Sequence, residues 1–420
     1  MGLGTRGLSC RLLGVLAASL VLAGCWTQVG FGPEHRRYNP FEQGITTDNV
    51  DTLSPLWTRE LQGGVSQPML ANGRVHISRD DNTIRSYDVD ALDAATGDTL
   101  WTRNLLPSSQ SSPTLSIGVT FSGNELWGSY AAPEGVALVR LDPESGATIA
   151  QEDGELVASP VVTGDDVLAY LRLGGTFADT TVVVRDRTTL ATLWTATITG
   201  APRSVMIGDG RIYLVSQTTL AAYPAAGCGA GTCTPLWQQQ LTDGSGINGA
   251  AAGPDGQVVT TTAFRFVEDR HGQRFPSPST LTVRDGATGA ALWSGGVTSA
   301  TGGLAIDDSR IYLSTRHELD DLGQPLGTDG LTAFALDGCG LPSCAGTWST
   351  TLAAPPSAPL VGGGVVYTSV GNDLHALATD GSALATFPGL GAPVSLGEGQ
   401  LYTTTFAAGT TTLRALAPVS

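Results

Sequence analysis

The side chains of this chain that could bind or react gather in two short insertions. One reads FVEDRHGQRFPSPS and the other RHELDDLGQPLGTDG. Both combine carboxylates, arginines and a histidine, which are groups that bind charged partners and exchange protons. The candidate binding residues are Glu268, Asp269, Arg270, His271 and Arg274 in the first insertion, and Arg316, His317, Glu318, Asp320 and Asp321 in the second. A pair of solvated loop tips is the simpler interpretation of each insertion taken alone.

No further motif assigns these residues to a reaction. The five histidines, His35, His76, His271, His317 and His375, do not have the spacing of metal ligands. Calcium at Asp320, Asp321 and Asp329 would lack the ligand spacing of a known calcium loop. The chain also has no G-x-S-x-G elbow. We therefore expect no catalytic residue and no metal site.

The elements that carry these insertions belong to a repeat. An Asp-containing turn followed by an apolar-aromatic strand occurs in DAATGDTLW and DGATGAALW, and less closely in DRTTLATLW and SPLW. The copies recur about every 45 residues, the spacing of propeller blades. The repeated aromatic residues are Trp57, Trp101, Trp194, Trp237, Trp293, Trp348 and Phe387, while one copy has Ala150 at this position.

A second strand precedes each copy and alternates apolar with small or polar residues, as in GRVHIS, DGRIYLVS and EGQLYTTTF. This period of two predicts half-buried strands. The unit that starts at Ala392 lacks its outer strand, whereas the SPLWTREL strand at Trp57 has no preceding unit. Pairing the two would close a ring. The sequence thus predicts an all-β, eight-bladed propeller of four-stranded antiparallel blades, with seven blades as the alternative because of Ala150.

The repeated tryptophans are interpreted as structural. In the turn from Asp93 to Gly97, Asp and Thr can hold backbone donors, and Gly tolerates positive φ. Such a turn would place Trp101 on a fixed face, where it would pack against the next blade. One flat cofactor needs one platform, so the repetition favours packing. In a propeller, both insertions would lie on one rim in adjacent blades, where loops on a rigid scaffold commonly bind partners.

The amino-terminal residues predict a targeting signal for export and lipidation. Arg6 and Arg11 precede the apolar run LLGVLAASLVLAG, as in a secretory signal. Leu22-Ala23-Gly24-Cys25 resembles a bacterial lipobox, which predicts cleavage before Cys25 and lipidation of that residue. The alternatives are an ordinary signal peptide and an uncleaved anchor, although the run is short for a span of ~20 residues. We expect a signal at 1–24, a lipidated lead-in segment at 25–52 and a single propeller domain at 53–420.

An extracytoplasmic location decides the interpretation of the other cysteines. Cys228 and Cys233 form one local pair, and Cys339 and Cys344 form another. Two local disulfides are expected in an oxidising compartment, and a four-cysteine metal site is the weaker alternative. The net charge of −16 disfavours nucleic acid as a partner.

The motifs DAATGDTLW and DGATGAALW resemble the tryptophan-docking repeat of the quinoprotein alcohol dehydrogenase-like propellers, also called PQQ-binding-like β-propeller repeat proteins. The segment from Gly30 to Trp57 is similar to their lead-in. The resemblance implies the fold, and it covers both dehydrogenases and non-catalytic scaffolds. Its dehydrogenases hold pyrroloquinoline quinone (PQQ) between a tryptophan and a disulfide of adjacent cysteines, beside calcium or a lanthanide. This chain has no adjacent cysteines and no C-x-x-C-H haem motif.

We therefore expect a lipid-anchored, extracytoplasmic and monomeric propeller, held on the membrane of the cell envelope. It would bind an envelope protein or cell-surface component without catalysis and without a cofactor. One alternative is a divergent quinoprotein dehydrogenase with PQQ and calcium. The other is a sensor that binds a small ligand or sugar through the rim loops.

Overall fold

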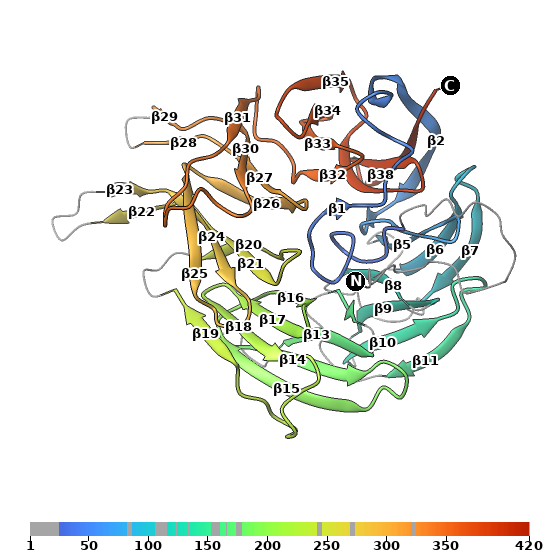
Figure 1. Ribbon diagram of the computed structural model, residues 1–420. Helices are drawn as coiled ribbons and strands as arrows, with labels where there is room; N and C mark the ends of the chain where they lie inside the picture. The colour runs from blue at the N-terminus through green and yellow to red at the C-terminus, as the bar shows by residue number, and fades with distance from the viewer. Residues whose placement is uncertain are drawn as a thin grey trace, which may run out of the picture.

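The strands form a ring of eight four-stranded antiparallel sheets, arranged as blades around a central axis (Figure 1). The computed structural model describes residues 25–81, 86–105, 116–122, 124–132, 135–152, 160–164, 166–173, 179–241, 246–268, 274–320 and 324–419. The eight-bladed, all-β fold is confirmed, and the seven-bladed alternative is wrong. We number the blades in chain order, beginning with the sheet that follows residue 63.

Blades 1 to 4 contain the first half of the ring. Blade 1 has a broken inner strand, β3 (Gly64–Val65) and β4 (Met69–Ala71), then β5 (Arg74–Asp81), β6 (Ser86–Asp93) and β7 (Thr99–Asn104). Blade 2 contains β8 (Ser116–Ser122), β9 (Glu125–Ala132), β10 (Gly135–Leu141) and β11 (Thr148–Glu152). Blade 3 contains β12 (Val162–Thr163), β13 (Val167–Leu173), β14 (Asp179–Asp186) and β15 (Thr192–Thr199). Blade 4 contains β16 (Pro202–Gly208), β17 (Arg211–Ser216), β18 (Thr219–Pro224) and β19 (Trp237–Gln240).

Blades 5 to 8 complete the ring. Blade 5 contains β20 (Ile247–Ala252), β21 (Gln257–Thr262), β24 (Ser279–Asp285) and β25 (Ala291–Val297). Blade 6 contains β26 (Ala300–Ile306), β27 (Arg310–Thr315), β30 (Gly330–Ala335) and β31 (Trp348–Thr351). Blade 7 contains β32 (Leu360–Gly362), β33 (Val365–Val370), β34 (Asp373–Ala378) and β35 (Ala383–Phe387), with β1 (Tyr38–Asn39) added inside β32. Blade 8 contains β36 (Ala392–Gly397), β37 (Gln400–Ala407), β38 (Thr410–Pro418) and β2 (Leu53–Gln62).

The ring closes in blade 8, where the two ends of the chain pair. Strand β2 pairs antiparallel with β38 along its whole length, from Leu53 opposite Pro418 to Gln62 opposite Thr410. The short 3-10 helix η1 (Val50–Thr52) precedes β2, and Val419 N donates to Thr52 O at 3.2 Å. The predicted closure is therefore confirmed. The pairing gives blade 8 the four strands of the other blades and joins the two ends of the chain in one sheet.

Tryptophan docking joins neighbouring blades. In the junction of blades 4 and 5, Trp237 Nε1 donates to Gly286 O at 2.9 Å, and the ring covers Gly289. A Cβ on Gly289 (φ +74°) would lie 2.6 Å from the indole, so glycine serves here both the turn and the close approach. Equivalent bonds run from Trp57 to Ala94, Trp101 to Pro143, Trp194 to Ala225, Trp293 to Leu336 and Trp348 to Thr379. The repeat thus encodes a contact made six times.

Two junctions lack this contact. At the junction of blades 2 and 3, Ala150 leaves room that Leu190 fills, since Leu190 is buried at the position where other turns have glycine. In blade 7, the prediction that Phe387 occupies the tryptophan position is wrong. Ala385, opposite Ala376, holds that position, and Phe387 lies two residues further on, opposite Leu374. The same β-bulge precedes Trp101 and Trp293, each of which lies four residues after its turn glycine, and Ala385 lies four residues after Gly381.

The two disulfides close loops that cover outer strands. The structure joins Cys228 to Cys233 and Cys339 to Cys344, each pair with a Cα–Cα separation of 5.7 Å. Thr195 N, in the preceding blade, donates to Gly231 O at 2.9 Å within the first loop. Ser294 N donates to Pro342 O at 2.9 Å within the second. Each loop therefore pairs with part of the outer edge of its neighbour.

An axial segment, residues 26–39, runs around the centre of the ring and contacts the inner strand of every blade (Figure 1). Its partners in blades 1 to 8 are, in order, Leu70, Phe121, Thr163, Ile207, Ala252, Ile306, Val361 and Leu396. Gly30, Phe31, His35 and Arg37 have positive φ, a conformation maintained by these surrounding contacts. Burial lowers the pKa of His35 to about 4.

The two ends of the ring differ, and we name them by their connections. The turn face carries the turns between first and second strands and between third and fourth strands, including Asp209-Gly210 and both disulfide loops. The hairpin face carries the connections between second and third strands and the links between blades. The axial segment meets the inner strands at the turn face. The described residues include no helix long and apolar enough to span a membrane, and the predicted signal at 1–24 lies outside them.

Candidate functional site

Two hairpins extend outward from the hairpin face in adjacent blades (Figure 1). Blade 5 carries β22 (Arg265–Glu268) paired with β23 (Arg274–Ser277), and blade 6 carries β28 (Glu318–Leu319) paired with β29 (Pro325–Leu326). Val267 lies opposite Phe275 on the first hairpin, with 38% and 50% of their surfaces exposed. Leu319, on the second, is 53% exposed. The hairpins thus present apolar side chains on a rigid ring.

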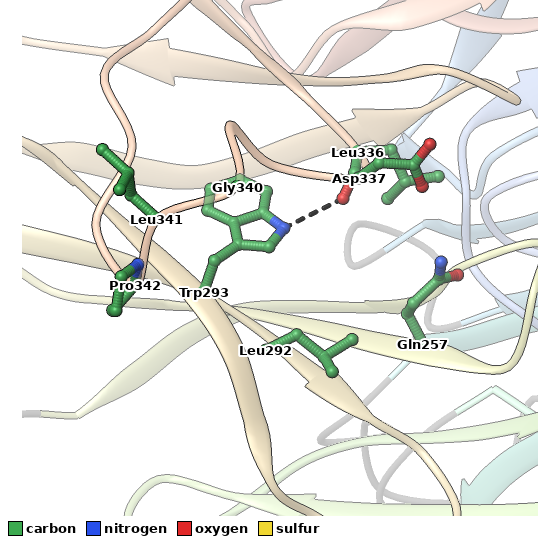
Figure 2. Close-up of a pocket in the computed structure, with 8 residues that line it drawn as sticks. All are labelled: Gln257, Leu292, Trp293, Leu336, Asp337, Gly340, Leu341 and Pro342. Atoms are coloured by element: carbon green, nitrogen blue, oxygen red, sulfur yellow. Dashed lines mark hydrogen bonds between the residues drawn. The ribbon is translucent and has the colours of Figure 1, made fainter.

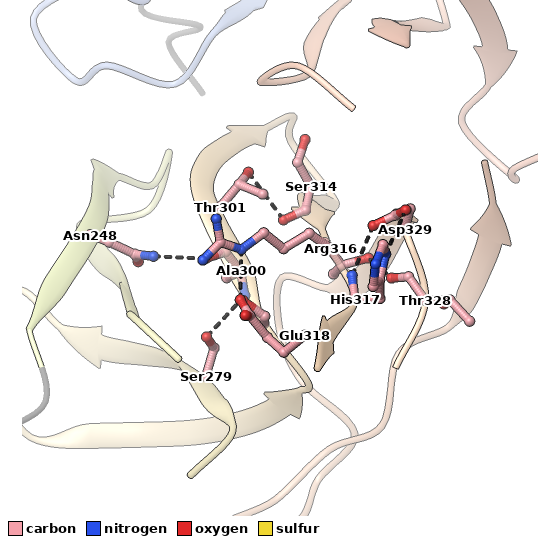
Figure 3. A network of polar contacts seen from close by, with 12 residues as sticks. Asn248, Ser279, Ala300, Thr301, Ser314, Arg316, His317, Glu318, Thr328 and Asp329 are labelled. Atoms are coloured by element: carbon pink, nitrogen blue, oxygen red, sulfur yellow. Dashed lines mark hydrogen bonds and ion pairs between the residues drawn. The ribbon is translucent and has the colours of Figure 1, made fainter. Parts of the chain in front are cut away.

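Arg316 and Glu318 form the base of the second hairpin (Figure 3). Arg316 Nε donates to Glu318 Oε1 at 2.6 Å, and Ser299 Oγ donates to the same oxygen at 2.8 Å. Arg316 N also donates to Ser299 O at 3.0 Å. Because Ser299 belongs to the link between blades 5 and 6, these bonds fix the hairpin to the blade junction. Half of the Arg316 side chain remains exposed and can meet a partner's carboxylate.

His317 is oriented by a buried carboxylate. Its backbone N donates to Asp329 Oδ1, and its Nδ1 lies 2.8 Å from Asp329 Oδ2. A carboxylate only accepts hydrogen bonds, so this contact places the proton of a neutral imidazole on Nδ1 and leaves Nε2 as an acceptor. The His317 side chain is 43% exposed, against 9% for Asp329. The pair therefore presents an oriented imidazole at the surface.

The network continues into blade 5 through backbone atoms (Figure 3). Ser279 Oγ accepts from Ala300 N at 2.9 Å, and Asn248 Nδ2 donates to Ala300 O at 2.8 Å. Asn248 Oδ1 in turn accepts from Thr261 Oγ1 at 2.7 Å. Both blades that carry hairpins are thus cross-linked beneath them, which limits the motion of one relative to the other.

In the described part of the chain, no serine, threonine or cysteine side chain is hydrogen-bonded to His317, so the pair activates no nucleophile there. Nor does that part contain a cluster of three or more His, Cys, Asp or Glu side chains suited to a metal. Asp329 bonds to His317, and Asp320 Oδ1 accepts from Gln324 N within the hairpin turn.

The ten predicted rim residues divide into three groups. Arg316, His317 and Glu318 lie together at one hairpin base, and Asp320 lies at its turn. Glu268 and Arg274 face each other across the first hairpin, although only their backbone is described. Asp269, Arg270, His271 and Asp321 lie outside the described residues. Prediction missed Ser299 and the role of Asp329, whose partners are defined only by strand register.

Two pockets lie beside blade 6. One, of about 390 Å³, adjoins the network and is lined by hydroxyl side chains and Trp348, including Thr298, Thr315, Thr328 and Ser349. The other, of about 430 Å³, lies at the turn face between the docked Trp293, Leu292 and the Cys339–Cys344 loop with Leu341 (Figure 2). The first offers mostly polar groups, and the second combines apolar side chains with Gln257 and Asp337.

Comparisons with known proteins agree with this architecture. A family model described as outer membrane protein assembly factor BamB matches residues 45–227. The quinohemoprotein alcohol dehydrogenase from Comamonas testosteroni has a similar structure, with a TM-score of 0.66 over 94% of this chain and 82% of that chain, at 13% identity. The family match covers less than half of the chain, and the structural similarity extends the propeller fold to nearly all of it.

Two further propellers have similar structures at equally low sequence identity. BamB from Moraxella catarrhalis gives a TM-score of 0.55 over 86% of this chain and 99% of that chain, at 14% identity. Sqt1 from Saccharomyces cerevisiae gives 0.55 over 89% and 97%, at 10% identity. No curated protein matches the sequence. At these identities the similarity establishes the fold, which hosts both a scaffold and a dehydrogenase, so function must come from the site.

Proposed function

We propose that this PQQ-repeat propeller is a lipid-anchored, non-catalytic binding module of the cell envelope, and that its two hairpins dock a partner protein. The observation that carries the proposal is the pair of adjacent hairpins with exposed Val267, Phe275 and Leu319 above a cross-linked base. Apolar anchors surrounded by polar groups are typical of protein interfaces. The match to a BamB family model supports an envelope partner.

Site-specific photocross-linking in intact envelopes tests the docking surface. A photoreactive residue replaces Phe275 or Leu319, and a matched control replaces Leu236, which is 54% exposed and directly precedes the outer strand β19. We expect the same discrete protein adduct from both hairpin positions and not from position 236. Adducts at position 236 alone, or none at either hairpin, would contradict the proposal.

Anchoring is tested on the purified mature protein. The lipobox-like sequence before Cys25 supports it, and Cys25 directly precedes the axial segment. Intact mass spectrometry should find an amino-terminal Cys25 carrying acyl chains, and Cys25→Ser should release the protein from the membrane. An unmodified Cys25 in the native protein would show that the anchor is absent.

The residues present do not suit a quinone site of the dehydrogenase kind. Six of the eight tryptophans are docked on neighbouring turns, and the other two, Trp26 and Trp127, are fully buried. Both described disulfides lie in outer loops of the turn face rather than beside the axis. We propose that the protein acts without PQQ. Titration with PQQ and calcium should leave the absorption spectrum of the quinone unchanged, and a stoichiometric complex would favour the dehydrogenase instead.

A further inference from the structure

The first residue after Cys25 is already fixed to the ring. Trp26 O accepts from Leu70 N at 2.6 Å, and the Trp26 side chain is fully buried against Phe31, with ring centroids 5.4 Å apart. Thr27 O then accepts from Phe121 N at 2.7 Å. No flexible linker therefore separates the anchored residue from the folded domain.

Cys25 lies at the turn face. Its Sγ is 4.0 Å from Glu398 Oε1, in the turn between the first two strands of blade 8. That same oxygen accepts from Gly73 N, in the corresponding turn of blade 1, at 3.4 Å. A lipid on Cys25 would thus leave the molecule at the end of the ring opposite the hairpins.

A belt of exposed apolar residues surrounds this end. In six blades the residue before the docking position is leucine or isoleucine, and between 42% and 54% of its surface is exposed. The belt consists of Leu56, Leu100, Ile149, Leu193, Leu236 and Leu292. Leu341, on the Cys339–Cys344 loop, is 64% exposed at the same end and borders the pocket that Leu292 also lines (Figure 2). Single exposed leucines are ordinary, but six at one repeated position share an orientation.

We infer that the turn face lies against the lipid bilayer and that the belt contacts its interfacial region. The inference rests on the proposed lipid anchor. Apolar side chains that ring an anchor add binding by entering the boundary between headgroups and acyl chains. The hairpins of blades 5 and 6 then lie at the end of the ring away from the membrane, where partners can reach them. The anchor does more than retain the protein, because it sets which face is available.

The charges of the turn face specify the lipid. Asp209, Asp255 and Asp308 are exposed there, although Arg211 pairs with Asp209 at 2.6 Å and Arg36 pairs with Asp308 at 2.7 Å. Anionic headgroups would repel these carboxylates. The surface therefore fits a zwitterionic bilayer, and phosphatidylethanolamine with phosphatidylcholine is the matching composition for a test.

Energy transfer to a dye in the bilayer measures the orientation. The lipidated full-length mature protein is reconstituted in such vesicles with a single label at Asp255→Cys on the turn face, or at Gln324→Cys in the β28–β29 turn. We expect transfer several-fold higher from position 255. Equal or reversed transfer from protein whose mass includes the lipid would overturn the orientation while leaving the anchor intact. Protein that carries no lipid in its native state would overturn the proposed anchor, and the inference with it.

Two variants test the cause of the orientation. A Gly-Ser linker of about ten residues between Cys25 and Trp26, spanning roughly 17 Å, should reduce transfer from position 255 toward that from position 324. The triple change Leu193→Ser, Leu236→Ser and Leu292→Ser should reduce it as well. The matched change Val267→Ser, Phe275→Ser and Leu319→Ser, on the hairpin face, should not. Transfer unaffected by both the linker and the belt change would show that neither holds the face to the membrane.

Discussion

The two ends of this ring are built on different principles. On the turn face, one turn and one tryptophan contact recur from blade to blade, and the axial segment meets all eight inner strands. On the hairpin face, the described paired extensions belong to blades 5 and 6, and their polar groups bond in a way that occurs once. Repetition thus accompanies stability, and the hairpins that depart from the repeat form the proposed docking surface.

The largest expected effect comes from breaking one repeated contact. Trp237→Ala would remove a buried indole and its bond to Gly286 O, at a cost of ~3–5 kcal/mol in the free energy of unfolding. Phe387→Ala, at a half-buried site without docking, should cost distinctly less. Urea unfolding followed by fluorescence and circular dichroism compares the two. Equal losses would mean that docking does not distinguish the tryptophan position.

A buried histidine near the turn face should make stability depend on pH. His76 is fully buried, its Nε2 is 3.3 Å from Pro143 O, and burial lowers its pKa to about 4. The unfolded chain has an ordinary histidine pKa near 6.5. As pH falls from about 6.5 to 4, unfolding therefore takes up a proton, and roughly 3 kcal/mol of stability is lost.

His76→Gln tests that linkage. The variant should start less stable at pH 7.5 but lose less of its stability between pH 6.5 and 4 than the parent does. The remaining slope should include His35, whose pKa burial also lowers to about 4. Urea midpoints across this range measure both slopes. Identical slopes would exclude His76 as a source of the acid sensitivity.

The junction without tryptophan offers a sharper test of docking. Ala150→Trp alone would meet Leu190, whereas Leu190→Gly alone would leave a cavity, so each should cost a few kcal/mol. Together they would restore the arrangement of Trp237 and Gly289. We expect a favourable coupling of about 1–3 kcal/mol in a double-mutant cycle of unfolding free energies. Simple additivity would show that this junction is packed on another principle.

The repeated parts of the fold were predicted from the sequence, and the parts without a repeat were not. The Asp-turn-Trp repeat predicted the blades, their number and the closing strand at Trp57, because each copy makes the same local contact. Phe387 was misplaced because the prediction followed the aromatic residue type, whereas the docking position lies four residues after the turn glycine, at Ala385. The axial segment was missed because its bonds mostly use backbone atoms, which any residue supplies.

The candidate site shows the same division. Arg316, His317 and Glu318 were found by residue type, since charged groups in an extended loop stand out against the repeat. Ser299 and Asp329 become their partners only when strands β25, β26, β27 and β30 are aligned in space. Sequence therefore identifies the groups that depart from the repeat, whereas the contacts that hold them require the fold.

Changes on the two hairpins should have the smallest effect on stability and the clearest effect on binding of the partner. Phe275→Ser with Leu319→Ser changes two side chains that are half exposed, so the free energy of unfolding should shift by no more than ~0.5 kcal/mol each. Because the same side chains are the proposed anchors, cross-linking to the partner from a probe at Val267 should be lost. Leu193→Ser with Leu236→Ser is the matched change on the belt and should preserve that cross-link. If both double variants abolished the cross-link equally, the hairpins would not be the docking surface, because exposed apolar residues anywhere on the protein would then account for binding.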